Sequence, residues 1–389
     1  MAVIKENKIE VSVVIPCLNE LETLSTCINK ALTAFKEGGF QGEIIVADNG
    51  STDGSQALAE SLGVRLIHVK EKGYGNALRG GFKAAKGSII VMGDADDSYD
   101  FLEIPRFVEA LREGNDMVLG TRLKGKIMPG AMPFLNRYVG NPVLSKLLNI
   151  FFRTGISDAH CGLRAFRRNC LPKMTLEAQG MELASEMVVK AALADLKLHE
   201  IPITLYKDGR NRKPHLRPFK DGWRHLKFLL TYSPMYLFFF PGFILLLTGL
   251  LPLVIIAWKP IWVGHSMFNT HTAVFFSSMT LIGYQILNLG IFAKTIARFE
   301  DRRKYDHIMN IFHREFTLEK GLILGLSISI PGLAILLYLI GLWVLNNFQD
   351  IKKINMAVFA TTILILGIQT IFSSFFLTIL MEEKKIKPF

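Results

Sequence analysis

The stretch Ser88-Ile89-Ile90-Val91-Met92-Gly93-Asp94-Ala95-Asp96 decides how the first half of this chain folds. It begins with a short, mostly apolar run, which is typical of a strand buried on both faces in a parallel sheet. Two carboxylates separated by one residue follow directly after the strand. On an extended turn, both acids can bind one hard divalent cation, and such a cation binds diphosphate oxygens. The stretch therefore predicts a Mg²⁺ or Mn²⁺ site for a phosphorylated, nucleotide-linked substrate.

The residues after this pair leave the edge of the metal site open. Asp97 or Ser98 can complete the metal shell, or they can cap the helix that follows, and Asp100 has the position of a helix cap. A solvated acidic turn without a metal is the alternative for the whole stretch. The buried strand that delivers Asp94 and Asp96 favours the metal.

Predicted strands and helices alternate on both sides of this stretch. The strands cover residues 11–16, 43–47, 64–69, 88–92 and 117–120, and the helices cover residues 20–36, 55–62, 75–85 and 102–113. This alternation predicts an open, mostly parallel α/β sheet, whose ligands bind at the carboxyl ends of the strands. The side chains that fall at or just beyond strand ends are Asn19, Asp48, Asp94 and Asp96.

The pattern weakens between about residues 121 and 232. Residues 123–137 are predicted to form a loop, 141–153 an amphipathic helix, 182–194 a helix, 199–205 a strand and 207–220 a basic loop. Residues 221–232 are predicted to form an amphipathic helix on a membrane surface.

Four long apolar runs occupy the rest of the chain, at about 234–258, 272–296, 322–345 and 356–381. Each is near the roughly 20 residues that cross a bilayer core, and four in succession argue against buried core helices. We therefore expect a domain at 1–215, an amphipathic juxtamembrane segment at 216–232 and a transmembrane domain at 233–389 with a basic loop at 297–320.

The charge distribution predicts how the chain is oriented in the membrane. The N-terminus lacks the apolar stretch of a signal peptide. Basic residues gather after the second run and at the chain end, at Lys294, Arg298, Arg302, Arg303, Lys304, Arg314, Lys320, Lys384, Lys385 and Lys387. The positive-inside rule then places the first domain and both termini in the cytoplasm.

The net charge and the cysteines fit the same interpretation. Anionic headgroups and anionic substrates explain the formal charge of +11 better than nucleic acid does. The four cysteines lack metal-ligand spacing and are expected to be reduced thiols of a cytoplasmic domain.

Further candidate residues follow from the same strand ends and turns. Asp48 can accept hydrogen bonds from a base or ribose, whereas Asp53 is expected to form a turn or cap. The turn that contains Lys72 and Asn76 opens a helix whose N–H groups could meet a phosphate, and a plain tight turn is the alternative. The cationic candidates for donor or acceptor phosphates are Arg122, Arg137, Arg164, Arg210, Arg212 and Lys213.

Two further site candidates, Asp158 and Arg164, lie at the ends of the stretch 158–164. His160 and Cys161 lack partners at catalytic or metal spacing, so we interpret both as structural.

Several of these stretches resemble the family 2 glycosyltransferases. Val13-Val14-Ile15-Pro16-Cys17-Leu18-Asn19-Glu20 resembles their V-I-P-x-x-N-E, Asp48-Asn49-Gly50-Ser51-Thr52-Asp53 their D-D-G-S-x-D, and Gly93-Asp94-Ala95-Asp96 their D-x-D metal motif. Residues 157–166 resemble the S-D-x-x-x-G-[FL]-[RK]-x-[FL] stretch of polyprenyl-phosphate glycosyltransferases, such as dolichol-phosphate mannose and glucose synthases. The resemblance covers residues 11 to about 230. In the membrane half it consists only of the presence of membrane helices after the first domain.

The resemblance implies a GT-A fold, a nucleotide-sugar donor and a Mg²⁺ or Mn²⁺ ion. By matched position, Pro16, Asn19, Glu20 and Asp48 would line the nucleotide pocket, Arg122 and Arg137 would bind the lipid phosphate, and Arg212 and Lys213 the donor diphosphate. We add Lys72 and Asn76 to the nucleotide site, Arg164 to the acceptor-phosphate site, and Asp158 to the catalytic residues Asp94 and Asp96.

The chain departs from the family pattern in three places. Asn49 replaces the second acid of D-D-G-S, Ser98 stands where relatives often carry Gln, and the basic loop lacks the G-x-S-K spelling. These departures leave the metal shell and the contacts of the basic loop open.

We therefore predict inverting transfer of one sugar from a nucleotide sugar to a polyprenyl phosphate, dolichyl or undecaprenyl, at the cytoplasmic face. The acceptor phosphate is already anionic and needs no strong general base. UDP-glucose and GDP-mannose are both open as donors, with UDP-glucose favoured.

Other classes of protein fit the sequence less well. A polysaccharide synthase normally carries a Q-x-x-R-W stretch, and Asp221-Gly222-Trp223-Arg224 is not one. A transferase that acts on another glycolipid and a non-catalytic scaffold are further alternatives, and a transporter would need ionisable residues in its spans. A homo-oligomer is compatible with the sequence.

Overall fold

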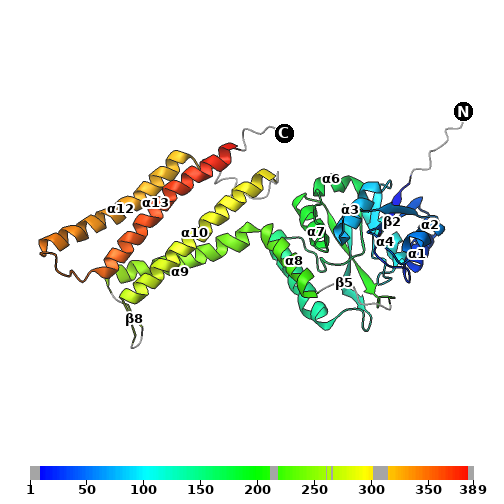
Figure 1. The fold of residues 1–389 in the computed structure, drawn as a ribbon, viewed down its shortest axis with the longest axis horizontal. Coiled ribbons are helices and arrows are strands. Elements are labelled where there is room, and N and C mark those ends of the chain that lie inside the picture. The colour runs from blue at the N-terminus through cyan, green and yellow to red at the C-terminus, as the bar shows by residue number, and fades with distance from the viewer. Residues whose placement is uncertain (1–8, 211–217, 260, 264–265, 301–313, 384–389) are drawn as a thin grey trace. The chain divides into compact units, whose positions relative to one another are not determined.

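The computed structural model describes residues 9–210, 218–259, 261–263, 266–300 and 314–383. The chain divides into two compact units, Met1–Leu229 and Leu230–Phe389 (Figure 1). The first unit contains a mixed α/β domain, and the second contains long apolar helices. Each unit is described separately.

A seven-stranded sheet forms the centre of the first unit, with strand order β3-β2-β1-β4-β6-β5-β7. The strands are β1 Val11–Cys17, β2 Gly42–Asp48, β3 Arg65–His68, β4 Ile89–Met92, β5 Met117–Ile127, β6 Arg164–Arg167 and β7 Leu198–Leu205. Only β6 runs antiparallel, to both β4 and β5. The prediction of a mostly parallel sheet is confirmed.

Helices connect the strands and cover both faces of the sheet. They are α1 Leu24–Gly38, α2 Ser55–Ser61, α3 Tyr74–Ala84, α4 Ile104–Arg112, α5 Asn141–Phe152, α6 Leu171–Met174, α7 Leu183–Leu193 and α8 Pro218–Thr231. Short 3₁₀ turns occupy Phe101–Glu103 and Arg168–Cys170, and a π turn occupies Asn136–Gly140. Helix α4 packs against one face of β1 and α3 against the other.

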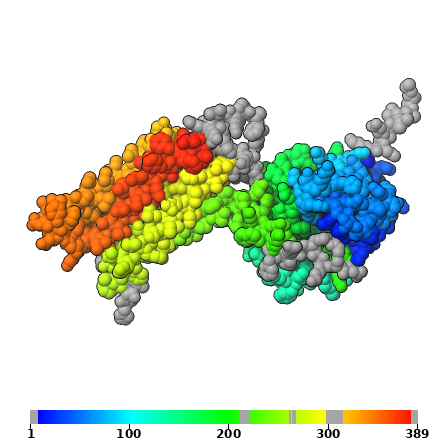
Figure 2. All heavy atoms as spheres, in the orientation of Figure 1, coloured from blue at the N-terminus to red at the C-terminus, as the bar shows by residue number. Residues whose placement is uncertain are grey.

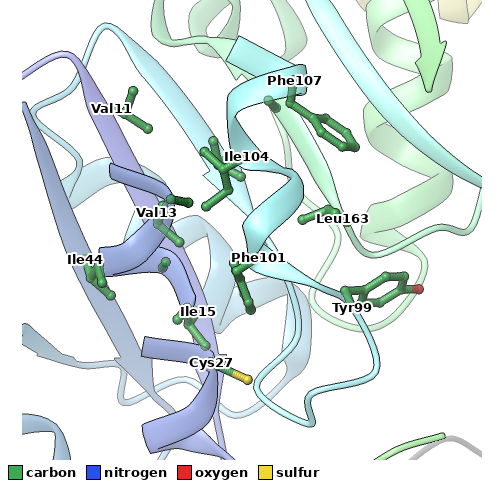
Figure 3. Packing of buried hydrophobic residues seen from close by; sticks show 14 of the residues in the cluster. Val11, Val13, Ile15, Cys27, Ile44, Tyr99, Phe101, Ile104, Phe107 and Leu163 are labelled. Atoms are coloured by element: carbon green, nitrogen blue, oxygen red, sulfur yellow. The ribbon is translucent and has the colours of Figure 1, made fainter. Parts of the chain in front are cut away.

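The alternation of side chains along β1 explains why the sheet is covered on both faces. Val13 and Ile15 belong to a buried cluster with Ile104 and Phe107 of α4 (Figure 3). Successive side chains of a strand point to opposite faces, so Val14 points away from this cluster, toward α3. Both faces of β1 are therefore buried, which is why the strand lacks a polar face.

Gly81 of α3 lies against that second face and gives the first testable prediction. A Cβ atom added at Gly81 would collide with Cγ1 of Val14 and lie 3.4 Å from Cβ of Ala47. We expect Gly81→Ala to destabilise the protein by about 1–3 kcal/mol through overpacking. Gly222 of α8 has open space around its Cα, so Gly222→Ala should leave the midpoint of thermal unfolding unchanged or raise it slightly. Equal midpoints for both variants would contradict this close helix–sheet contact.

The structure corrects two predictions around the second half of the sheet. Strand β5 continues to Ile127, where residues 123–137 were expected to form a loop, because Lys126 and Ile127 pair with Thr204 and Leu205 of β7. Strand β6 was not predicted at all. It has four residues with an arginine at each end, so its polar termini mask a short buried pair of apolar residues.

The second unit contains four helices long and apolar enough to cross a membrane, at Met235–Trp258, Thr270–Ile296, Leu318–Leu345 and Ile354–Met381. They correspond to a π turn at Met235–Phe239 with α9 Phe240–Trp258, then α10 Thr270–Glu300, α12 Leu318–Leu345 and α13 Ile354–Glu383. Helices α10, α13 and α12 lie side by side, in yellow, red and orange (Figure 2). A hairpin of β8 Ile261–Val263 and β9 Ser266–Phe268 joins α9 to α10 and was not predicted.

Small and hydroxyl-bearing side chains lie where these helices meet. Gly325 and Gly332 of α12 approach the backbone of α13, and Gly249 of α9 approaches α10. Two hydroxyl pairs join α10 to α13: Ser277 to Thr362 at 2.7 Å and Tyr284 to Thr370 at 2.6 Å. Close backbone contact and hydrogen bonds between helices are what hold helices together in lipid.

Candidate active site

Asp94 and Asp96 lie directly after β4, at the carboxyl end of the parallel strands. The Tyr74 hydroxyl donates a hydrogen bond of 2.8 Å to Oδ1 of Asp94. Oδ1 of Asp96 accepts hydrogen bonds from the Ser98 backbone N–H at 3.0 Å and the Ser98 hydroxyl at 2.6 Å. Burial and the neighbouring Asp96 charge together raise the pKa of Asp94 to about 6. The two carboxylates therefore repel each other in a partly desolvated place, which a cation would relieve.

The second oxygen of Asp96 already has a cationic partner. Nη2 of Arg210 lies 2.8 Å from Oδ2 of Asp96 and 3.1 Å from Oδ2 of Asp208, and Nη1 lies 3.1 Å from Oε1 of Glu20. The structure thus places Arg210, one of the cationic candidates, among the carboxylates of Glu20, Asp96 and Asp208.

The neighbours of the acid pair have partners of their own. Asp97 is paired with Lys30 at 2.8 Å, and the Ser98 hydroxyl is directed at Asp96. Asp100 accepts a hydrogen bond from the Leu102 N–H, so the expected cap is confirmed. Asp97 and Ser98 therefore act here as an ion-pair partner and a turn residue.

The donor set fits one Mg²⁺ or Mn²⁺ ion that takes further ligands from its substrate. Asp94 and Asp96 offer hard carboxylate oxygens, as these ions prefer. Within the described residues, no group of three or more His, Cys, Asp or Glu side chains could hold a metal ion by itself. A cation held by Asp94 and Asp96 would therefore complete its shell with water or with phosphate oxygens of a substrate.

Asp48 lies at the end of β2 and anchors the neighbouring turn. It accepts hydrogen bonds from the N–H groups of Gly50 and Ser51 and from the Gln56 amide. Burial alone would raise the pKa of Asp48, but these hydrogen bonds lower it. Asp48 is therefore an ionised acceptor at the sheet edge.

The residues after β1 are linked to that turn. Asn19 has φ of +59°, and its side-chain oxygen accepts a hydrogen bond of 2.7 Å from the Thr52 N–H. The Glu20 N–H donates to the Ser55 hydroxyl. Pro16 is buried within β1, opposite Ala47 of β2. These contacts hold Asn19 and Glu20, which follow β1, against the turn that Asp48 anchors.

Asn49 explains one departure from the family pattern. Its amide nitrogen donates to the carbonyls of Val69 and Glu71, and its amide oxygen accepts from the Gly73 N–H. An Asp at this position could not donate those two hydrogen bonds. Nζ of Lys72 donates to the Asn49 carbonyl at 2.6 Å, so Lys72 adds a further hydrogen bond between the same two loops.

The turn before α3 is a tight structural turn. The N–H groups of Gly75 and Asn76 donate to the Gln179 carbonyl, and the Asn76 side chain contacts Lys72 and Arg79. These N–H groups are therefore already used, which corrects the idea that they meet a phosphate. The nucleotide-binding assignments of Lys72 and Asn76 stay predictions.

Arg122 and Asp158 form a buried ion pair on the other side of β4. Nε of Arg122 lies 2.7 Å from Oδ2 of Asp158 and Nη2 lies 2.8 Å from Oδ1, while the side chains are 10% and 0% exposed. Nη1 of Arg122 donates to the Tyr99 hydroxyl at 3.3 Å. Oε1 of Glu200 accepts hydrogen bonds from the N–H groups of Ser157 and Asp158. Asp158 thus orients Arg122, and Glu200 orients Asp158.

Arg164 is a structural arginine, which corrects its assignment to the acceptor-phosphate site. Its side chain is fully buried, and its guanidinium donates to the carbonyls of Cys161, Ala184 and Ala159. His160 is also internal, with Nε2 3.1 Å from the Ser185 hydroxyl.

The remaining cationic predictions lie outside this cluster or outside the described residues. The Arg137 guanidinium lies over the Tyr138 ring, 5.3 Å from its centroid. Arg212 and Lys213 fall in the segment 211–217, which lies outside the described residues. Their roles stay predictions.

Gly162 gives a second testable prediction because its backbone supports Asp94. A Cβ atom at Gly162 would collide with Oδ2 of Asp94 and lie 2.8 Å from Cε2 of Tyr99. Gly162→Ala should therefore shift the Asp94 carboxylate. If Asp94 acts in a reaction, the variant should lower the reaction rate by about 10²-fold, since catalysis tolerates little misplacement. Gly341 has open space around it, so Gly341→Ala is the matched control. A Gly162→Ala protein with the wild-type initial rate would show that Asp94 is not held here.

Sequence reasoning missed three residues of this site, Tyr74, Tyr99 and Glu200. The Tyr74 and Tyr99 hydroxyls bind Asp94 and the Gly162 N–H, respectively. No motif flags these residues, because each acts on a site residue from a distant element. Only the glycines around Tyr74 mark its turn in the sequence.

Known proteins share both units with this chain. Residues 12–174 match the family "Glycosyl transferase family 2", and residues 291–381 match "Glycosyltransferase family 2 C-terminal transmembrane region". Low-salt glycan biosynthesis hexosyltransferase Agl6 of Haloferax volcanii is 40% identical over 372 residues, covering 95% of this chain and 89% of that protein.

Two further proteins are similar to part of this chain. A dolichyl-phosphate hexose transferase of Haloferax volcanii is 30% identical over 184 residues, covering 47% of this chain and 77% of that protein. A crystal structure of glucosyl-3-phosphoglycerate synthase from Mycobacterium tuberculosis has a TM-score of 0.45 at 22% identity, covering 59% of this chain and 82% of the other.

The two matched regions and the extent of the Agl6 match identify the family of the chain. The first unit is a GT-A domain, and the second contains the membrane helices. The protein is therefore an enzyme of the membrane that transfers sugars. The chain belongs to glycosyltransferase family 2.

Proposed function

We propose that this enzyme transfers one sugar from a nucleotide sugar to a polyprenyl phosphate, with inversion, at the cytoplasmic face of the membrane. The observation that carries the proposal is the acid pair Asp94 and Asp96 directly after β4, in a chain whose described residues include four helices long and apolar enough to cross a membrane. The similarity to a hexosyltransferase and to a dolichyl-phosphate hexose transferase supports the acceptor.

On the donor side, Asp48 would accept hydrogen bonds from the base or ribose, and Pro16, Asn19 and Glu20 would line the same pocket. Asp94 and Asp96 would hold a Mg²⁺ or Mn²⁺ ion, which when bound offsets charge on the leaving nucleoside diphosphate. Tyr74 fixes the orientation of Asp94, and Ser98 fixes that of Asp96. The two carboxylates are thus oriented before substrate arrives, which favours catalysis.

On the acceptor side, Arg122 would bind the lipid phosphate. Two of its nitrogens are held by Asp158, while Nη1 donates a hydrogen bond of 3.3 Å to the Tyr99 hydroxyl. A phosphate oxygen could therefore bind at Nη1 without breaking the buried pair. The anionic phosphate would attack the anomeric carbon directly as the diphosphate leaves from the opposite side, which inverts the centre and needs no general base.

The membrane helices would bring the lipid to the site. We infer a cytoplasmic catalytic domain at 1–215, a juxtamembrane segment at 216–232 and a transmembrane domain at 233–389, with both termini cytoplasmic. The charge asymmetry of the loops supports this orientation. A prenyl tail held in the bilayer confines its phosphate near the active site, which is a proximity effect.

The direct test is incubation of the purified protein with Mn²⁺, a polyprenyl phosphate and a panel of nucleotide sugars. We expect one donor of the UDP-glucose or GDP-mannose type to give a lipid one hexose heavier, with inverted configuration by NMR. A product that carries several sugars would instead indicate a polymerising enzyme. No product with any donor would contradict the proposal.

A further inference from the structure

The Arg210 guanidinium lies among three carboxylates, with its side chain 10% exposed. Two of them belong to the proposed donor site: Asp96, whose Oδ2 is 2.8 Å from Nη2, and Glu20, whose Oε1 is 3.1 Å from Nη1. The third, Asp208, lies two residues earlier in the chain. The preceding Gly209 N–H donates to the Asp96 carbonyl at 3.0 Å, so backbone and side chain both hold Arg210 at the Asp96 turn.

This position conflicts with a metal ion at the same carboxylate. Oδ1 of Asp96 accepts two hydrogen bonds from Ser98, and Oδ2 is paired with Arg210. A divalent cation on Oδ2 would lie close to a guanidinium of like charge, and such repulsion is strong where water is largely excluded. The ion and Arg210 therefore compete for Asp96.

A guanidinium that leaves Asp96 needs another anion. Arginine binds phosphate oxygens through two parallel hydrogen bonds, and a donor diphosphate would arrive at this end of the sheet together with the metal. The diphosphate supplies the negative charge that Arg210 loses, and the metal supplies the positive charge that Asp96 loses. The exchange keeps both Asp96 and Arg210 paired with an opposite charge.

We propose that Arg210 occupies the metal-binding oxygen of Asp96 in the donor-free enzyme and moves to the donor diphosphate when metal and nucleotide bind. The inference rests on the proposed function. Its consequence is positive coupling: each of Mn²⁺ and nucleoside diphosphate binds more tightly when the other is present. Couplings of this kind are typically about 5- to 150-fold and reciprocal.

Two simpler explanations predict different results for Arg210→Met. If Arg210 only supports the turn, its loss should weaken Mn²⁺ binding. If it only adds positive charge nearby, any neighbouring cation should matter equally. Lys30 tests the second idea, because it pairs with Asp97 at 2.8 Å, one residue from Asp96.

The experiment measures binding to the full-length protein in nanodiscs. Free Mn²⁺ is followed by EPR without nucleotide, and UDP and GDP affinities are measured by calorimetry without Mn²⁺ and at saturating Mn²⁺. The proteins are wild type, Arg210→Met, Arg210→Lys and Lys30→Met, each checked for a cooperative thermal transition. Arg210→Lys keeps the charge but loses the two-pronged geometry, so it guards against misfolding of the Met variant.

We expect Arg210→Met to bind Mn²⁺ at least about fivefold more tightly without nucleotide, and to lose the part of the coupling between Mn²⁺ and nucleotide that Arg210 adds to direct metal–phosphate contact. Arg210→Lys should fall between it and wild type, and Lys30→Met should change Mn²⁺ affinity less than about twofold. Unchanged or weaker Mn²⁺ binding by Arg210→Met, or an equal gain in Lys30→Met, would overturn the inference alone. Absence of Mn²⁺ binding by every protein, even with nucleotide, would overturn the proposed metal dependence as well.

Discussion

Asp96→Asn will lower the rate of sugar transfer by about 10³-fold or more at saturating donor and acceptor, because it removes one of the two carboxylates proposed to hold the metal ion that offsets charge on the diphosphate. The substitution keeps the size of the side chain, and its amide oxygen can still accept the hydrogen bonds from Ser98. It also removes the ion pair with Arg210. Folding should therefore persist while the ability to hold a divalent cation is lost. Initial rates at several Mn²⁺ concentrations measure the effect.

Asp97→Asn is the matched control for that variant. Asp97 is adjacent in sequence and carries the same charge, but it is paired with Lys30 on a partly exposed surface. Pairs of this kind contribute about 0–1 kcal/mol, so transfer should change little. If Asp96→Asn kept the wild-type rate, Asp96 would not hold a metal ion that the reaction needs.

Asp158→Asn is expected to have the largest effect on stability together with a loss of acceptor use. The pair with Arg122 is buried, and Asp158 is fully inaccessible. Arg122 lowers the pKa of Asp158 against the opposing effect of burial, so the carboxylate is charged at neutral pH. Removing one partner of a buried pair leaves an uncompensated charge and costs about 3–5 kcal/mol. Chemical denaturation of purified protein measures this loss.

The pair also has a kinetic signature that a purely structural role would lack. Arg122 without Asp158 would still carry its charge but would lose its orientation, so the KM for polyprenyl phosphate should rise more than the KM for the nucleotide sugar. Lys124→Met is the control, because it breaks the pair of Lys124 with Glu200 at an exposed lysine. Equal changes in both KM values would mean that Arg122 does not act on the acceptor.

Much of the fold could be predicted because its signals are local. Local sequence alone predicts the apolar strands β1 and β4 and the turn after β2. The four long apolar helices can be predicted from composition alone. β6 was missed because its identity depends on pairing with β4 and β5 rather than on its own four residues.

Residue type and position after β4 select Asp94 and Asp96 as metal candidates, and that assignment stays a prediction. Sequence reasoning failed where the partners of a side chain decide its role. Arg164 looks like a phosphate ligand in the sequence, yet three carbonyls satisfy its guanidinium inside the domain. Asn49 looks like a degenerate acid, yet its two donated hydrogen bonds require an amide. Such contacts join residues far apart in the chain, so no local pattern contains them.

The central claim is that the sugar acceptor is a lipid phosphate. The most direct measurement compares a polyprenyl phosphate with the corresponding unphosphorylated polyprenol as acceptors for the same labelled nucleotide sugar, using the full-length protein in nanodiscs. We expect a single-sugar product from the phosphate and none from the alcohol, because the proposed site binds the phosphate through Arg122 and has no general base assigned to activate an alcohol. Equal transfer to the polyprenol, or transfer to neither lipid while another glycolipid is extended, would contradict it.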